Sequence, residues 1–191
     1  LEFRRVLFRS QELDKAVNYL NDGHVIAHAT EAIFGLAARA LDYEACKRVW
    51  EIKNRPFKKK FIIIFSSIDE VRKYSIINLK NEQKIEETWP GHTTWVLKST
   101  QICPFWLKDA NGTLAVRVTK HGQMLSLIER CGPLVSTSAN LSGSPPAKDF
   151  REAIKALGGN SLVSYILPGE TCGKTRPSAI YDGSTNKKIR A

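Results

Sequence analysis

The chain has 191 residues, of which 42% are hydrophobic and 25% charged, as expected for one folded domain with its own core. No apolar run approaches the roughly 20 residues that a membrane-spanning helix needs, so no membrane association is expected. The formal net charge of +10 suits a polyanionic partner such as nucleotide phosphate or RNA, but a solvated basic surface accounts for it equally well.

Residues 1–10 differ from the rest of the chain. Three arginines lie among apolar residues, without the uninterrupted apolar core of a signal peptide. We expect this segment to be a non-native or disordered leader that packs loosely or not at all, and residues 11–191 to form the folded domain. Ser10 is the expected cap of a helix that ends at 21–23. The apolar face of this helix would consist of Leu13, Ala16, Val17 and Leu20.

The next elements alternate between strands and helices. His24–His28 is expected to be a short buried strand, and Phe34–Leu36 to lie in an irregular segment. Asp42 is the expected cap of a helix that runs to about Asn54. Phe61–Phe65 is apolar on both faces, which predicts a central strand in a sheet covered on both sides.

The rest of the chain continues this alternation. Helices are expected at 68–74, 82–88, 124–131 and 150–157. Strands are expected at 93–97, 114–118, 134–137, 162–166, 178–181 and 188–190, and a turn at 140–143. This order of elements predicts a single-domain α/β fold with a mixed sheet and helices.

A basic segment follows the second predicted helix. Five of the eight residues from Lys53 to Lys60 are basic, and such a density of charge repels itself unless an anion neutralises it. Phosphate is a suitable anion, because arginine offers a planar fork for two of its oxygens. For the lysines at 58–60 an ordinary solvated loop is the favoured interpretation, whereas Lys53 and Arg55, close to the helix end, are the better candidates for function.

Small polar residues leave the end of a predicted buried strand at Val135–Asn140. Ligands of open α/β sheets bind at the carboxyl ends of strands. In an extended chain Ser136, Ser138 and Asn140 would share one face, where they could bind a phosphate or a small polar ligand. An ordinary turn rich in Ser, Thr and Asn is an equally good interpretation.

Arg117 lies between two valines in a predicted strand. Its side chain must therefore face solvent or be paired with an anion. A substrate carboxylate is one such anion, and a structural ion pair or an exposed arginine is the favoured alternative.

The common strong motifs of catalysis and metal binding are absent from the sequence. There is no phosphate loop, dinucleotide-binding glycine pattern, zinc-protease motif or nucleophile elbow. The cysteines form no C-x-x-C pair and the histidines show no ligand spacing, so we predict no protein metal site and expect reduced thiols. The cysteines are Cys46, Cys103, Cys131 and Cys172.

Six stretches in order resemble the YrdC/TsaC family of threonylcarbamoyl-AMP synthases, in its short bacterial form. They are HVIAHATEAIFGL at 24–36, IKNRP at 52–56, WPGHTT at 89–94, LAVRV at 114–118, PLVSTSANLSG at 133–143 and PSAI at 177–180. The resemblance implies a twisted YrdC-like α/β fold with a concave basic pocket. It also implies a nucleotidyltransferase, which forms threonylcarbamoyl-AMP and pyrophosphate from L-threonine, bicarbonate and ATP.

The resemblance further implies partners and roles for residues. The product would serve tRNA-modification proteins in t6A37 modification of tRNA, Mg²⁺ would accompany ATP, and the protein would be cytoplasmic. Lys53 and Arg55 would be catalytic through their charge on the phosphates. The residues implied to bind ATP are Lys53, Arg55, Thr113, Ser138, Asn140 and Arg190. Those implied to bind threonine are Thr30, Arg117, Ser136 and Ser178, with Arg117 on the carboxylate.

The sequence departs from the family pattern at several positions. Ala29 and His92 stand where proline is usual, Asn54 replaces a frequent glycine, and Lys60-Phe61 replaces Pro-Leu. Two other functions stay open at this point. One is an RNA-binding module in rRNA or ribosome maturation, which the net charge favours. The other is a carbamoyltransferase domain of the same fold, which would use carbamoyl phosphate.

Overall fold

The computed structural model describes residues 2–57, 59–140, 144–174 and 176–190. Within these ranges the helices are α1 (Glu2–Asn21), α2 (Tyr43–Lys53), α3 (Ile68–Tyr74), α4 (Leu79–Thr88), α5 (Gly122–Cys131) and α6 (Phe150–Leu157). The strands are β1 (Val25–Ala29), β2 (Phe34–Arg39), β3 (Ile62–Phe65), β4 (Ser75–Ile76), β5 (Thr93–Ser99), β6 (Thr113–Val118), β7 (Leu134–Ser138), β8 (Val163–Ile166), β9 (Ala179–Asp182) and β10 (Lys188–Arg190). None of the helices in this part of the chain is long and apolar enough to cross a membrane.

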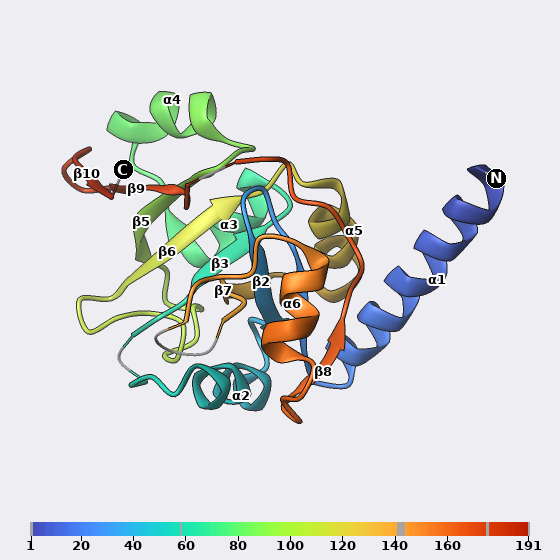
Figure 1. Cartoon of the computed structure of the whole chain (residues 1–191). Helices are drawn as coiled ribbons and strands as arrows, with labels where there is room; N and C mark the ends of the chain where they lie inside the picture. Colours follow the sequence, from blue (N-terminus) through green and yellow to red (C-terminus); the bar gives the residue numbers. More distant parts are fainter. Residues whose placement is uncertain (1, 58, 141–143, 175, 191) are drawn as a thin grey trace.

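The strands form one mixed sheet, which confirms the predicted α/β fold (Figure 1). Their order is β10-β9-β5-β6-β3-β7-β2-β1-β8, and β4 pairs with β5. β3 runs parallel to β6 and antiparallel to β7. The prediction of a central strand at 61–65 is therefore confirmed. It also places β6 and β7, where the sequence predicts functional residues, on either side of β3, so that Ala115 and Ser136 both pair with Ile62.

Helices cover both faces of the sheet. Alternate residues of a strand point to opposite faces, and those of β1 and β3 join two different buried clusters. Ile26 and Ile64 pack with α1 and α5. Val25, Ala27 and Ile63 pack with α2, α3, α4 and α6. The fold is thus a three-layer arrangement whose core lies on both sides of β3.

The first helix is longer than predicted. It begins at Glu2, not after Ser10, because residues 2–9 contain no glycine or proline to interrupt it. Figure 1 shows its first turns extending away from the rest of the molecule. Its C-terminal half is anchored by the buried side chains Ala16, Val17 and Leu20. That residues 1–10 are non-native stays a prediction.

The segment Phe34–Leu36 was predicted as irregular, and this prediction is wrong. It forms the start of β2, which pairs with β1 on one side and β7 on the other. Gly35 explains the error, since glycine is uncommon in strands. A Cβ on Gly35 would lie 3.2 Å from the Thr137 carbonyl oxygen and 3.2 Å from Thr30 Cγ2. The glycine thus permits a close approach of two strands. Residues 141–143 of the predicted turn lie outside the described residues.

Candidate active site

A cavity of about 670 Å³ opens beside the central strands. This volume lies within the range of about 300–1000 Å³ that is usual for small-molecule sites. Thr113, Ala115 and Arg117 line it, since alternate residues of β6 face the same side. Ser136 and Ser138 line it from β7 in the same way. The neighbours of β3 therefore supply the floor of the site.

The lining of the cavity carries an excess of positive charge. Four of its described residues are cationic at neutral pH, and one is acidic. The cations are Arg55, Lys60, Arg117 and Arg190, and the acid is Asp109. An anionic ligand such as a nucleotide triphosphate is favoured in such a cavity.

Lys53 joins the end of α2 to the end of β7. Its Nζ lies 2.9 Å from the Ser138 carbonyl oxygen, 2.6 Å from the Asn140 carbonyl oxygen and 2.6 Å from Asn140 Oδ1. Ser138 Oγ donates to the same Asn140 Oδ1 at 2.6 Å. The two predicted segments therefore meet. Lys53 and Asn140 lie behind the lining of the cavity, whereas Ser138 reaches it.

The burial of Lys53 changes its titration. The side chain is only 7% exposed. Burial, with the positive charge of Arg55 as a second cause, lowers the pKa of Lys53 to about 8. The four oxygen atoms within 3.4 Å of Nζ favour the charged form and oppose this shift.

Arg55 reaches the cavity directly. Its guanidinium lies 4.5 Å from the centroid of the Phe61 ring and donates to the Lys60 carbonyl oxygen at 3.2 Å. Its Nε has no hydrogen-bond partner among the described residues. Burial lowers the pKa of Arg55, yet an arginine stays charged in proteins. A fixed cation therefore lines the cavity.

The described lysines of the segment 58–60 differ in their surroundings. Lys60 lines the cavity, and its Nζ lies 3.7 Å from the centroid of the Phe57 ring. Lys59 is exposed, as expected for a solvated loop. Lys58 lies outside the described residues. The solvated-loop interpretation thus holds for Lys59 but not for Lys60.

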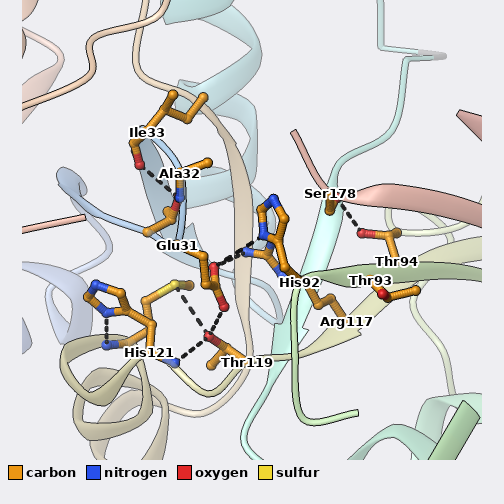
Figure 2. A network of polar contacts seen from close by, with 12 residues as sticks. Glu31, Ala32, Ile33, His92, Thr93, Thr94, Arg117, Thr119, His121 and Ser178 are labelled. Atoms are coloured by element: carbon orange, nitrogen blue, oxygen red, sulfur yellow. Dashed lines mark hydrogen bonds and ion pairs between the residues drawn. The ribbon is translucent and has the colours of Figure 1, made fainter. Parts of the chain in front are cut away.

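Arg117 lies in a buried polar network (Figure 2). It is 5% exposed, and its Nη2 lies 3.2 Å from Oε2 of Glu31, which is 1% exposed. Its Nη1 faces His92 Nδ1 at 3.4 Å. Thr119 Oγ1 donates to Glu31 Oε1 at 2.7 Å. The structural ion pair considered from sequence is therefore present. Arg117 nevertheless lines the cavity, and its Nε has no partner among the described residues.

The charges in this network depend on one another. Burial alone would raise the pKa of Glu31, but the His92 imidazole, the Arg117 guanidinium and the Thr119 hydroxyl together hold it below its ordinary value. Burial lowers the pKa of Arg117, and the charge of Glu31 opposes that shift. The carboxylate and the guanidinium are therefore both charged at neutral pH.

Two threonines line the cavity from opposite directions. Thr30, in the loop between β1 and β2, donates through Oγ1 to the Ile33 carbonyl oxygen at 2.7 Å. Thr113 Oγ1 donates to Asp109 Oδ2 at 2.9 Å. Each hydroxyl is thus oriented by a protein acceptor, and Thr30 Oγ1 also accepts from the Ala32 N–H at 3.5 Å.

Ser178 and Arg190 close the cavity at the other edge. Ser178 Oγ lies 2.9 Å from Thr94 Oγ1, and Arg190 Nη2 donates to the Ser178 carbonyl oxygen at 3.0 Å. Burial lowers the pKa of Arg190. This contact holds β10 beside β9. Arg190 is the fourth cation in the lining of the cavity.

The structure brings most of the predicted site residues together. Eight of them line the cavity, namely Thr30, Arg55, Thr113, Arg117, Ser136, Ser138, Ser178 and Arg190. Lys53 and Asn140 contact Ser138 from behind. Glu31 was not predicted. The need of Arg117 for an anion indicates from sequence that a carboxylate lies nearby, but it does not indicate which one.

The site offers little to a resident metal ion. Among the described residues no group of three or more His, Cys, Asp or Glu side chains could hold one. Both oxygens of Asp109 already accept hydrogen bonds. Mg²⁺ usually keeps several waters and binds through substrate phosphates with one or two carboxylates. Asp109 is the one carboxylate in the described lining of the cavity, and binding of Mg²⁺ with a nucleotide stays a prediction.

Comparison with known proteins defines the class. The sequence profile of the Sua5/YciO/YrdC family, described as telomere recombination, matches residues 18–191. The chain belongs to this family. It is 37% identical over 177 residues to the threonylcarbamoyl-AMP synthase of Nitrosococcus oceani, covering 92% of this chain and 95% of that protein. It is also 37% identical over 183 residues to the enzyme of the same name from Xanthomonas euvesicatoria pv. vesicatoria, covering 94% and 97%.

Solved structures agree with this assignment. P. abyssi Sua5 in complex with L-threonine is 30% identical, with a TM-score of 0.81 over 89% of this chain. The match covers 50% of that protein, so this chain spans about half its length. E. coli YciO, at 23% identity and a TM-score of 0.79, shares the fold.

Proposed function

We propose that this chain is an L-threonylcarbamoyladenylate synthase, a nucleotidyltransferase that makes threonylcarbamoyl-AMP and pyrophosphate from L-threonine, bicarbonate and ATP. One observation carries the proposal: cations from the Lys53–Lys60 segment meet the hydroxyl-rich end of β7 at a single cavity. Relatives that match nearly the whole chain are named for this activity.

The reaction needs orientation and charge neutralisation more than a protein nucleophile. The threonine amine attacks CO2, or bicarbonate with loss of water, and forms an N–C bond. The amine loses a proton, which leaves a carbamate. An oxygen of the carbamate attacks the α-phosphorus of ATP, and the bond to the β-phosphate oxygen breaks. Pyrophosphate leaves with the negative charge.

Each residue of the cavity has a proposed part in this reaction. Arg117 binds the threonine carboxylate, with polar contacts from Thr30, Ser136 and Ser178. Arg55 offsets the charge on the phosphates, and Lys53 supports it by fixing the Ser138–Asn140 turn. Polar contacts and charge for ATP also come from Thr113 and Arg190. Bound with ATP, Mg²⁺ would supply further neutralisation of the triphosphate, next to Arg55 and Lys60.

The product would be passed to tRNA-modification proteins in the cytoplasm for t6A37 synthesis. Threonylcarbamoyl-AMP is a mixed anhydride, so its threonylcarbamoyl group is activated for transfer to an amine. A protein that releases such a product needs a partner that consumes it. The net charge of +10 would suit an RNA substrate held nearby.

Pyrophosphate release from ATP tests the proposal. We expect release to require both L-threonine and bicarbonate. Arg55→Ala should lower turnover by about 10- to 1000-fold, the scale for loss of one electrostatic contact to a transition state. Arg151→Ala, at an exposed position on α6, is the matched control and should leave turnover unchanged. Release that persists without threonine would contradict the proposal, and a normal rate in Arg55→Ala would remove Arg55 from the mechanism.

A further inference from the structure

Glu31 is a buried carboxylate with no part in the reaction described so far. It lies in the loop between β1 and β2, directly after Thr30, and is 1% exposed. A buried charge is costly unless it is paired and hydrogen-bonded. Glu31 lies next to Arg117 but outside the lining of the cavity. The energetic cost of burying Glu31 is therefore connected with Arg117 and not with direct contact to a ligand.

Glu31 is fixed by contacts from separate parts of the chain. Oε1 accepts a hydrogen bond from Thr119 Oγ1 at 2.7 Å, and Thr119 follows the end of β6. The Glu31 carbonyl oxygen accepts a hydrogen bond from the Lys174 backbone N–H at 3.1 Å. Oε2 accepts no hydrogen bond among the described residues, and it lies 3.2 Å from Arg117 Nη2 and 3.9 Å from His92 Nδ1 as a charge partner. Hydrogen bonds therefore fix Glu31 at Oε1 and at its backbone, and leave Oε2 directed at Arg117 (Figure 2).

Arg117 is paired at its two terminal nitrogens, whereas its Nε is buried and unpaired among the described residues. Nη2 faces Glu31 Oε2 at 3.2 Å, and Nη1 faces His92 Nδ1 at 3.4 Å. His92 is itself fixed, since its Nε2 donates to the Arg176 carbonyl oxygen at 2.9 Å. The Arg117 Nε has no partner among the described residues. A guanidinium fixed in this way can meet a carboxylate without first losing its own conformational freedom.

We propose that Glu31 is a positioning residue, which holds the Arg117 guanidinium in the orientation that binds the amino-acid carboxylate. This inference rests on the proposed function of the cavity. Glu31 does not touch the substrate and acts through Arg117. A misplacement of about 1 Å in such a group can cost about 100-fold in activity, which is why supporting contacts matter.

Separate kinetic constants for the two substrates test this role. Glu31→Gln keeps the size of the side chain and can still accept from Thr119, but it removes the charge that Arg117 faces. We expect the KM for threonine to rise by about 10-fold or more, with the KM for ATP within about twofold of wild type. Asp14→Asn, which removes the carboxylate of an exposed ion pair with Arg130, is the matched control and should change neither constant.

A double-mutant cycle separates positioning from a general structural effect. If Glu31 acts through Arg117, then Glu31→Gln should add nothing to the threonine KM of an Arg117→Gln enzyme. A threonine KM unchanged by Glu31→Gln, or equal losses for threonine and ATP, would overturn the inference. Full additivity of the effects of Glu31→Gln and Arg117→Gln on the threonine KM would also overturn the inference.

Thr119 provides a second test if Glu31→Gln does not fold. Thr119→Val removes the hydrogen bond to Glu31 and should raise the threonine KM, as Glu31→Gln does. Thr119→Ser keeps the hydroxyl and should leave the threonine KM near that of the wild type. A normal threonine KM in Thr119→Val would count against the inference.

Calorimetric measurement of threonine binding to the wild-type chain distinguishes a failure of the proposed function from a failure of the proposed role of Glu31. Absence of binding there contradicts the proposed function itself, whereas normal wild-type binding with an unaffected Glu31→Gln variant contradicts only the role of Glu31.

Discussion

Lys53 links two of the segments that form the site. It joins α2 to the turn after β7, and its ammonium contacts both backbone and side-chain oxygens there. The sequence places Lys53 among the phosphate ligands, and the structure places its Nζ against Ser138 and Asn140 instead. Its effect on ATP would therefore be partly indirect, through the position of the Ser138 hydroxyl.

The lowered pKa of Lys53 leads to a prediction about pH. We expect Lys53 to titrate near pH 8, well below the usual value of 10.5, because burial and then Arg55 disfavour its charge. Carbon-13 NMR of the lysine ε-carbons, assigned with Lys53→Met, measures this directly. A Lys53 signal that titrates with the surface lysines would contradict the prediction.

The same shift has a consequence for stability. Between about pH 8 and 10.5 the unfolded chain binds more protons at this position than the folded chain does. The ionisation of Lys53 therefore destabilises the folded chain below about pH 8, and this penalty decreases as the pH rises through that window. In Lys53→Met this part of the pH dependence should disappear in urea denaturation curves.

Individual residues also show the limit of sequence reasoning. Arg117 could be recognised because a charge between two valines needs a partner. Glu31 could not be identified as that partner, since nothing in a single sequence relates residue 31 to residue 117. Their contact arises only when the loop after β1 folds over the end of β6.

The end of α2 explains one departure from the family pattern. Asn54 adopts a left-handed conformation, with φ 43° and ψ 51°, and its N–H bonds back to the helix carbonyls. Glycine is the usual residue at such a helix end, and asparagine tolerates it. The helix itself begins at its predicted cap, where Asp42 accepts from the Ala45 N–H at 3.0 Å.

We therefore predict different effects on stability for two substitutions at the end of α2. Asn54→Gly should change the free energy of unfolding by less than about 0.5 kcal/mol, and Asn54→Ala should lower it by about 1 kcal/mol. Urea denaturation measures both. A larger loss for glycine than for alanine would contradict the account of this helix end.

The two halves of α1 should differ in their contribution to stability. Deletion of residues 1–10 should lower the Tm by less than about 2 °C, because these turns extend away from the rest of the molecule (Figure 1). Leu20→Ala, at a fully buried position, is the comparison and should lower the Tm by at least about 4 °C. Thermal unfolding measures both. A fall of several degrees on deletion of 1–10 would contradict the loose packing expected of this segment.

Elements with a strong apolar pattern were predictable, and those defined by pairing were not. The bounds of α3 are those predicted at 68–74, and β3 is central, as its apolar faces indicate. β2 was missed because Gly35 hides it, and β4 because two residues carry no periodic pattern. Such strands form only where a partner strand supplies the hydrogen bonds, which a local pattern does not contain.

Over the whole molecule, charge selects between two cavities. A second cavity, of about 1050 Å³, is larger and lies beside the N-terminal ends of α5 and α6. Its lining contains one arginine, Arg151, against the carboxylates Glu12, Asp149 and Glu170. A triphosphate would be repelled there, whereas four cations line the first cavity. Size alone would favour the second cavity, and charge favours the first.

The location of a bound nucleotide is therefore the most direct test of the account. A crystal structure with L-threonine and an ATP analogue that cannot release pyrophosphate would determine it. We predict the triphosphate between Arg55 and Ser138, and the threonine carboxylate on Arg117. A nucleotide bound in the second cavity, or away from the end of β7, would contradict the central claim.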